Sequence, residues 1–127
     1  MAKIVRFLAA LVFAGTLAAC VQTTPEGQGI RGQVLLGPNC PVVQEDEPCP
    51  DTPYQTELVV TSADGVREIK RFSSDADGRF EVNLPAGAYS IRSPGGTGLP
   101  YCSVNDVLDV RPGRMTETTV FCDSGIR

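Results

Sequence analysis

The sequence predicts an all-β domain, an antiparallel β-sandwich of about seven strands. Apolar and polar residues alternate in short segments, as in residues 79–84, where Phe80, Val82 and Leu84 share one face. Turn residues such as Asp-Gly and Pro-Ala-Gly separate these segments at spacings of about 8 to 12 residues, as is typical of sandwiches. After residue 20, no segment shows the apolar spacing of a helix.

Residues 1–19 are expected to be a signal peptide that is not part of the fold. Lys3 and Arg6 precede an apolar run of 11 residues, 7–17, which is shorter than the about 20 residues that a membrane-spanning helix needs. The segment Leu17-Ala18-Ala19-Cys20 resembles the lipobox of bacterial lipoproteins, in which cleavage precedes the cysteine and its thiol is then lipidated. Two or three acyl chains would anchor the protein stably. The alternative is ordinary cleavage that leaves Cys20 as a free thiol.

Residues 20–29 are then the lipidated cysteine and a flexible tether, and residues 30–127 the domain. The predicted strands are 30–36, 54–61, 66–72, 79–84, 88–92, 104–110 and 116–121. Gly32 lies on the inner face of its strand, which predicts the close approach of a neighbouring backbone. Asp64-Gly65 and Asp77-Gly78 predict tight hairpin turns, the first with a two-residue loop.

Five cysteines are an awkward number for an exported protein, but lipidation of Cys20 leaves an even set. The remaining four are Cys40, Cys49, Cys102 and Cys122. They lack the C-x-x-C spacing that is typical of a metal site, so we expect disulfides and no metal. A three-residue turn with Gly113 in the left-handed region would place Cys102 opposite Cys122 and Val104 opposite Val120. The pairs would then be Cys40–Cys49 and Cys102–Cys122, unless a bulge shifts the register.

Residues 37–53 form a long loop with five prolines, and such loops are often functional or constrained. A Cys40–Cys49 bridge would close a ring of 10 residues, which is worth roughly 2.5 to 3 kcal/mol. The candidate interaction loop comprises the acidic residues of this ring together with a tyrosine that follows the glycine-rich segment 93–100. These residues are Glu45, Asp46, Glu47 and Tyr101. The alternative is that the acidic residues form only a solvated tip.

Charge and composition limit the possible functions. Without the signal peptide, 9 basic residues face 15 acidic ones, a net charge of −6. This balance disfavours nucleic acid and anionic lipid surfaces as partners, so lipid attachment is expected to hold the protein at the membrane. The chain has no histidine, the commonest general base and transition-metal ligand, so we expect neither catalysis nor a cofactor.

Asp75 and Asp77 resemble the start of a calcium-binding loop, in which alternate carboxylates and a glycine surround the ion. The glutamate that such loops require six positions after the glycine is replaced by Leu84. The pair is therefore expected to serve the turn, with calcium as the weaker alternative.

Three segments resemble small exported bacterial proteins with a carboxypeptidase regulatory-like domain of the transthyretin (prealbumin) type. They are GIRGQVLLGPNCPV, SSDADGRFEVNLPAGAYSIR and the closing DSGIR. The family pattern D-x-x-G-x-F, then L-P-x-G-x-Y, is matched by Asp75, Gly78, Phe80, Leu84, Pro85, Gly87 and Tyr89. The resemblance implies a Greek-key β-sandwich and a non-catalytic interaction module. Related hydroxyisourate hydrolases depend on histidines and a C-terminal tyrosine motif, both of which this chain lacks.

The expected function is that of a lipid-anchored envelope protein whose domain contacts another protein or a glycan. Val21 replaces the aspartate that is associated with inner-membrane retention in enteric bacteria, which favours the outer membrane for a Gram-negative source, on its periplasmic face or its surface. Two alternatives remain open: a passive structural lipoprotein, and an accessory or inhibitor of a periplasmic enzyme that uses the Cys40–Cys49 loop.

Overall fold

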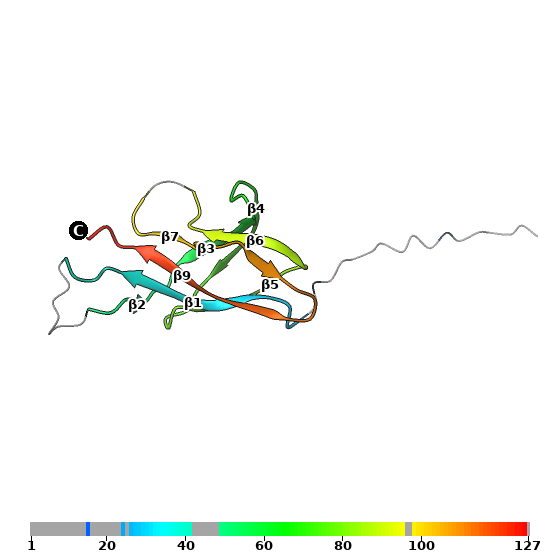
Figure 1. The fold of residues 1–127 in the computed structure, drawn as a ribbon, viewed down its shortest axis with the longest axis horizontal. Helices are drawn as coiled ribbons and strands as arrows, with labels where there is room; N and C mark the ends of the chain where they lie inside the picture. Colours follow the sequence, from blue (N-terminus) through cyan, green and yellow to red (C-terminus); the bar gives the residue numbers. More distant parts are fainter. Residues whose placement is uncertain (1–14, 16–23, 25, 42–48, 96–97, 127) are drawn as a thin grey trace, which may run out of the picture.

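The computed structural model describes residues 15, 24, 26–41, 49–95 and 98–126, and these form β-strands and no helix (Figure 1). The strands are β1 (Gly29–Gly37), β2 (Thr52–Pro53), β3 (Glu57–Ser62), β4 (Glu68–Ser73), β5 (Arg79–Asn83), β6 (Gly87–Arg92), β7 (Tyr101–Ser103), β8 (Leu108–Val110) and β9 (Met115–Asp123). The predicted all-β class is confirmed. In this part of the chain, no helix is present that is long and apolar enough to cross a bilayer.

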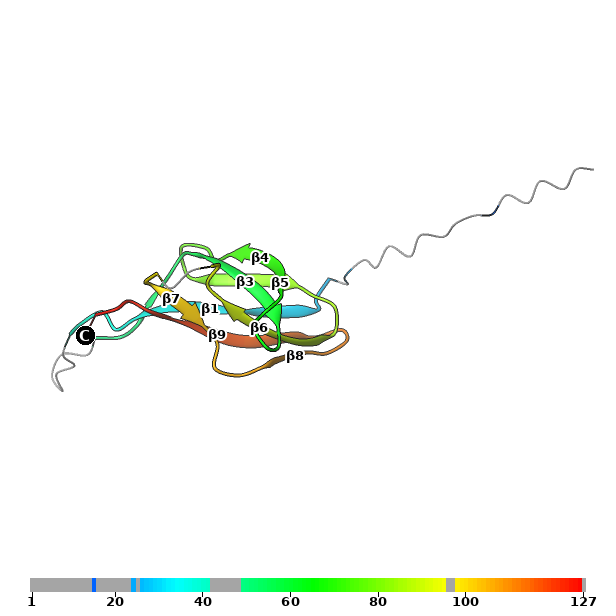
Figure 2. The ribbon, with the colours of Figure 1, turned by 90° about the horizontal axis from the view of Figure 1, so that it is seen from above.

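The strands form one mixed sheet in the order β2-β1-β9-β7-β6-β3-β4, with β5 also paired to β1 and β8 to β6. The sheet curls round on itself, so that strands from both ends of this order surround a single core (Figure 2). Phe72 of β4 and Phe80 of β5 meet across the closure, with ring centroids 4.9 Å apart. The curl therefore buries one face of nearly every strand.

The core contains the residues that the alternation predicted. Phe80, Leu84, Tyr89 and Ile91 are all buried. The Tyr89 hydroxyl donates a hydrogen bond of 2.7 Å to the carbonyl of Pro85, which gives the buried phenol a partner. Burial raises the pKa of Tyr89, because the charged phenolate would lose its hydration.

The prediction of a wholly antiparallel sheet is wrong, because β1 and β9 are parallel. Their register runs from Gly29 opposite Met115 to Gly37 opposite Asp123. Alternation of apolar residues shows which face of a strand is buried but not the direction of its neighbour. Most of the chain separates these two strands, so no tight turn sets their relative direction.

The close approach predicted at Gly32 is confirmed at this parallel pair. A Cβ atom at residue 32 would lie 1.8 Å from the carbonyl oxygen of Thr118 on β9. Only a residue without a side chain allows the two backbones to pair here.

The expected hairpin between residues 104–110 and 116–121 is not formed. β7 pairs with β9 and places Cys102 opposite Cys122, as predicted, but β8 pairs with β6 instead. The register of β7 with β9 is the predicted one, and just beyond β7 the N–H of Val104 donates to the carbonyl of Ile91 at 3.2 Å. Of the predicted strand 104–110, only Leu108–Val110 forms a strand, and it pairs with β6. The turn keeps Gly113 in the left-handed region, with φ of 72°.

The hairpin between β3 and β4 has a longer loop than the two residues predicted. The N–H of Ser62 donates to the carbonyl of Arg67, which leaves four residues between them. Within this loop, the Asp64 carboxylate accepts hydrogen bonds from the Ser62 hydroxyl and from the N–H of Val66. These two interactions, the hydroxyl first, lower the pKa of Asp64.

The contact at Gly32 yields a stability prediction. Gly32→Ala is expected to lower the free energy of unfolding by about 2 to 3 kcal/mol or more, because the new methyl group would overlap the β9 backbone. Thermal unfolding followed by circular dichroism would measure the effect. Gly98→Ala is the control, since a Cβ atom at residue 98 meets nothing within 4 Å. Equal melting temperatures for the two variants would contradict the proposed role of Gly32.

Candidate functional site

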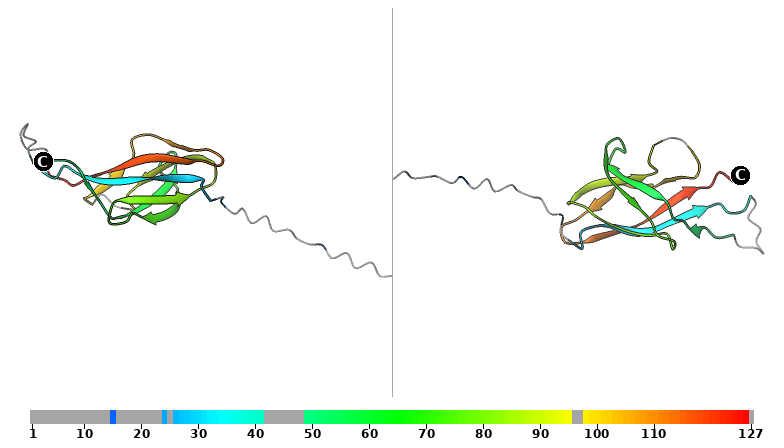
Figure 3. Two further views of the ribbon diagram at one scale, coloured as in Figure 1. Left: turned by 90° about the horizontal axis from the view of Figure 1, so that it is seen from below. Right: turned by 180° about the vertical axis from the view of Figure 1, so that it is seen from behind.

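The chain enters the domain at one end, and β2 and the C-terminal segment lie at the other (Figures 1 and 3). Residues 26–28 lead directly into β1. At the opposite end, Leu36 pairs with Thr52, and Gly37 and Tyr101 both pair with Asp123. We call these the anchor end and the distal end.

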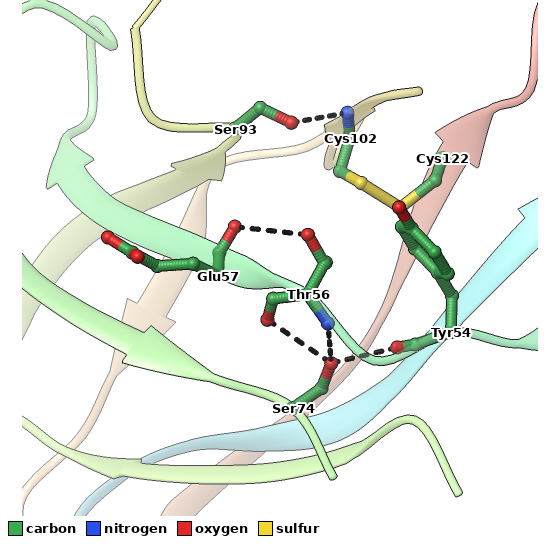
Figure 4. The surroundings of a disulfide bond; sticks show 7 residues. All are labelled: Tyr54, Thr56, Glu57, Ser74, Ser93, Cys102 and Cys122. Carbon is green, nitrogen blue, oxygen red and sulfur yellow. Dashed lines mark hydrogen bonds between the residues drawn. A yellow bond between two sulfur atoms is a disulfide. The ribbon is translucent and has the colours of Figure 1, made fainter. Parts of the chain in front are cut away.

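A disulfide joins β7 to β9 close to the distal end (Figure 4). Cys102 and Cys122 are both buried, with their Cα atoms 3.9 Å apart. The N–H of Cys102 donates to the hydroxyl of Ser93 at 2.8 Å, and the Tyr54 ring is directed toward the disulfide. The predicted Cys102–Cys122 bond is confirmed.

The predicted Cys40–Cys49 disulfide is also present, with the Cα atoms 6.1 Å apart. Asn39 reinforces the base of the loop, because its side-chain amide donates to the carbonyls of Leu36, at 3.1 Å, and Pro50, at 2.9 Å. The loop is therefore fastened by a covalent bond and by hydrogen bonds to both of its sides. The candidate acidic residues Glu45, Asp46 and Glu47 lie outside the described residues.

An apolar row crosses the outer face of the sheet beside this loop. Pro53 of β2 pairs with Leu35 of β1, which pairs with Phe121 of β9. The Phe121 side chain points outward, because its neighbours Val120 and Cys122 point into the core, and Phe121 remains 49% exposed. Sequence reasoning missed Phe121, although the alternation within β9 was a signal that could have identified it.

A hollow of about 460 Å³ lies next to this row. It is lined by Gly37, Pro38, Asp51, Tyr101, Ser103, Phe121, Cys122 and Asp123. The carboxylate of Asp51 occupies the space that a Cβ atom at residue 37 would fill, since that atom would lie 1.9 Å from Oδ1. We call Leu35, Asp51, Tyr101 and Phe121 the distal surface. The structure therefore brings the predicted Tyr101 together with two side chains that the sequence did not single out, Asp51 and Phe121.

A larger hollow, of about 940 Å³, covers the outer face of β1, β5 and β9, but it carries a different kind of surface. Two of its polar side chains have partners: Arg31 lies 2.9 Å from Glu117, and the Gln33 amide donates to the carbonyl of Asp77 at 3.1 Å. Arg31 and Glu117 are both well exposed. An exposed ion pair of this kind contributes less binding free energy to a protein contact than an exposed aromatic side chain does.

The candidate calcium residues serve the turn before β5. One carboxylate oxygen of Asp75 accepts hydrogen bonds from the N–H groups of Asp77 and Arg79, each at 2.9 Å. Gly78 follows with φ of 72°. Among the residues that the structure describes, no three His, Cys, Asp or Glu side chains gather as metal ligands. Asp75 is thus already engaged by the backbone.

The folded domain begins earlier in the chain than the sequence predicted. Cys20 lies outside the described residues. Gln28, expected in the flexible tether, is buried, and its amide nitrogen donates to the carbonyl of Leu84 at 3.0 Å. Its amide oxygen accepts the N–H of Gly113, also at 3.0 Å. Gln28 and Gly29 therefore belong to the domain, because Gln28 supplies partners to two loops that would otherwise lack them.

No protein-family model matches this sequence, and comparison with curated proteins gives no match either. The resemblance to the carboxypeptidase regulatory-like domain therefore stays a prediction.

The two aspartates before β5 can be separated by mutation. Asp75→Ala should lower the melting temperature by roughly 4 to 8 °C, the equivalent of about 1 kcal/mol, because the turn loses two accepted hydrogen bonds. Asp77→Ala is the matched control and should change it little. Adding calcium to the unmutated protein should leave the melting temperature unchanged. A rise with calcium that Asp75→Ala abolishes would contradict the turn role.

Proposed function

We propose that this chain is a lipid-anchored protein of the bacterial cell envelope, whose β-domain makes non-catalytic contacts with another protein through its distal surface. The lipid is carried by Cys20, and the outer membrane is the proposed address. The curled sheet is proposed to be a Greek-key β-sandwich of the transthyretin type. A single core enclosed by strands from both ends of the sheet supports that classification.

The observation that carries this proposal is that Phe121 is exposed and pairs with Leu35 and Ser103 near the distal end, opposite the chain's entry. A lipid at Cys20 would hold the anchor end at the membrane and leave the distal surface facing away from it. Exposed aromatic side chains beside a hollow are frequent centres of protein interfaces.

The rigidity of the distal end also favours a contact role. Both disulfides lie at or near it, and Asn39 fastens the loop base. A surface that is already ordered loses little conformational entropy when a partner binds. Disulfides also persist only in oxidising compartments, which supports export.

The lipid anchor is tested by mass spectrometry of the mature protein from its bacterial source. We expect an N-terminal peptide that begins at Cys20 and carries a diacylglyceryl group and an amide-linked acyl chain. Cys20→Ser should remain unprocessed, because the lipid-acceptor thiol is missing. An unmodified mature N-terminus would refute the anchor.

The contact surface is tested by photocrosslinking in living cells, with a benzoylphenylalanine residue at position 121. We expect one discrete protein adduct, because the side chain at 121 lies in the proposed interface. The control places the same group at position 66, since Val66 is 77% exposed and lies on the β3–β4 loop. In a second experiment the benzoylphenylalanine stands at position 101. Phe121→Ser should then abolish the adduct while leaving the melting temperature of the protein unchanged.

Equal labelling from positions 121 and 66 would contradict a dedicated contact surface. That result would favour the alternative of a passive structural lipoprotein.

A further inference from the structure

The anchor end carries two arginines on a turn that is hydrogen-bonded to the chain's point of entry. Arg111 and Arg114 are both exposed, and they flank the tight turn at Pro112 and Gly113. The N–H of Gly113 donates to the Gln28 side chain at 3.0 Å, and the N–H of Gly29 donates to the carbonyl of Arg114 at 3.2 Å. The backbone of the turn that carries the two arginines is therefore tied to the residues where the chain enters the fold.

A third cation lies at the same end. The Lys70 ammonium is 3.4 Å from the carbonyl oxygen of Asn83, and the neighbouring Leu84 is bonded to Gln28 through its N–H and its carbonyl. Two carboxylates, Glu26 and Asp109, lie close in the chain to this group and oppose it. Among these five residues, the three cations exceed the two carboxylates by one.

Among the described residues, the distal end carries carboxylates: Asp51 and Asp123 both line the hollow there. β1 has nine residues, which corresponds to a length of about 30 Å between the two ends. At physiological salt the Debye length is about 8 Å, so a surface at the anchor end is screened from the distal carboxylates. The net charge of −6 therefore does not describe what a membrane beneath the anchor end would experience.

From these observations we propose that the 111–114 turn docks on anionic phospholipid headgroups and holds the domain upright, with the distal surface away from the bilayer. The proposal rests on the proposed lipidation of Cys20, which precedes Gln28 by eight residues, a reach of at most about 28 Å. Attachment by lipid keeps the turn at high effective concentration near the surface, so weak contacts suffice.

Each arginine near an anionic surface favours the docked state by about 5-fold, and two by about 25-fold before Glu26 and Asp109 oppose them. The sign of the interaction is thus the reverse of the one that the whole-chain charge predicts.

The test attaches the mature chain, residues 20–127, through the Cys20 thiol to a maleimide phospholipid in nanodiscs that contain a paramagnetic lipid. One set of discs is phosphatidylcholine, and the other is equal parts phosphatidylcholine and phosphatidylglycerol. On the anionic discs we expect amide broadening confined to residues 26–28, 83–87 and 111–114. On phosphatidylcholine it should spread over several faces, because the domain tumbles on its tether.

The double variant Arg111→Gln/Arg114→Gln should lose the confined pattern on anionic discs, and added salt should do the same to the unmutated chain. Arg67→Gln/Arg79→Gln is the matched control, because it removes the same charge from exposed positions elsewhere and should keep the pattern. Equal melting temperatures for the two double variants exclude a folding defect.

A pattern that is unchanged by Arg111→Gln/Arg114→Gln, or that is the same on both kinds of disc, would overturn the proposal. In this experiment the maleimide linkage at Cys20 takes the place of biological lipidation. A failure of the docking proposal is therefore distinguishable from a failure of lipidation in cells, which the mass spectrometry of the mature N-terminus detects.

Discussion

The parallel pairing of β1 with β9 is the constraint on which the rest of this structure depends. It joins the first strand of the domain to the last over nine residue pairs. Such a pairing requires the backbones to come close at its centre, and Gly32 makes that possible because a side chain there would overlap Thr118. The central position of β9 then sets the positions of β7, through the Cys102–Cys122 bond, and of the chain's C-terminal segment.

The same pairing creates the two ends of the molecule. At the anchor end it brings Gly29 beside the 111–114 turn, where Gln28 satisfies backbone groups of two separate loops. At the distal end it aligns Leu35 with Phe121 on the solvent face. A contact surface at one end and a cationic turn at the other are thus consequences of one strand pair, separated by the length of that pair.

The effect of each charged group in this protein depends on its position in the fold and not on the net charge of the chain. Some ions are paired on the outer face, as in Arg31–Glu117, and some carboxylates serve turns, as Asp64 and Asp75 do. Arg111 and Arg114 lie on the turn at the anchor end, whereas Asp51 and Asp123 line the hollow at the distal end. Because salt screens electrostatic interactions over about 8 Å, each end of a domain this long interacts with its surroundings separately.

Local patterns in the sequence were enough to predict the all-β class, the buried faces, both disulfides and the close approach at Gly32, because these follow from alternation, turn chemistry and spacing along a strand. It also pointed to Tyr101 and to the turn role of Asp75. The fold was needed to show that β9 runs parallel to β1, that Leu108–Val110 pairs with β6 and not with β9, and that Gln28 is buried. Only the fold likewise placed Phe121 beside Asp51 and held Arg111 and Arg114 against the chain's entry point. These features depend on pairings between residues far apart in the chain, and local patterns do not specify which distant strand a segment meets or in which direction.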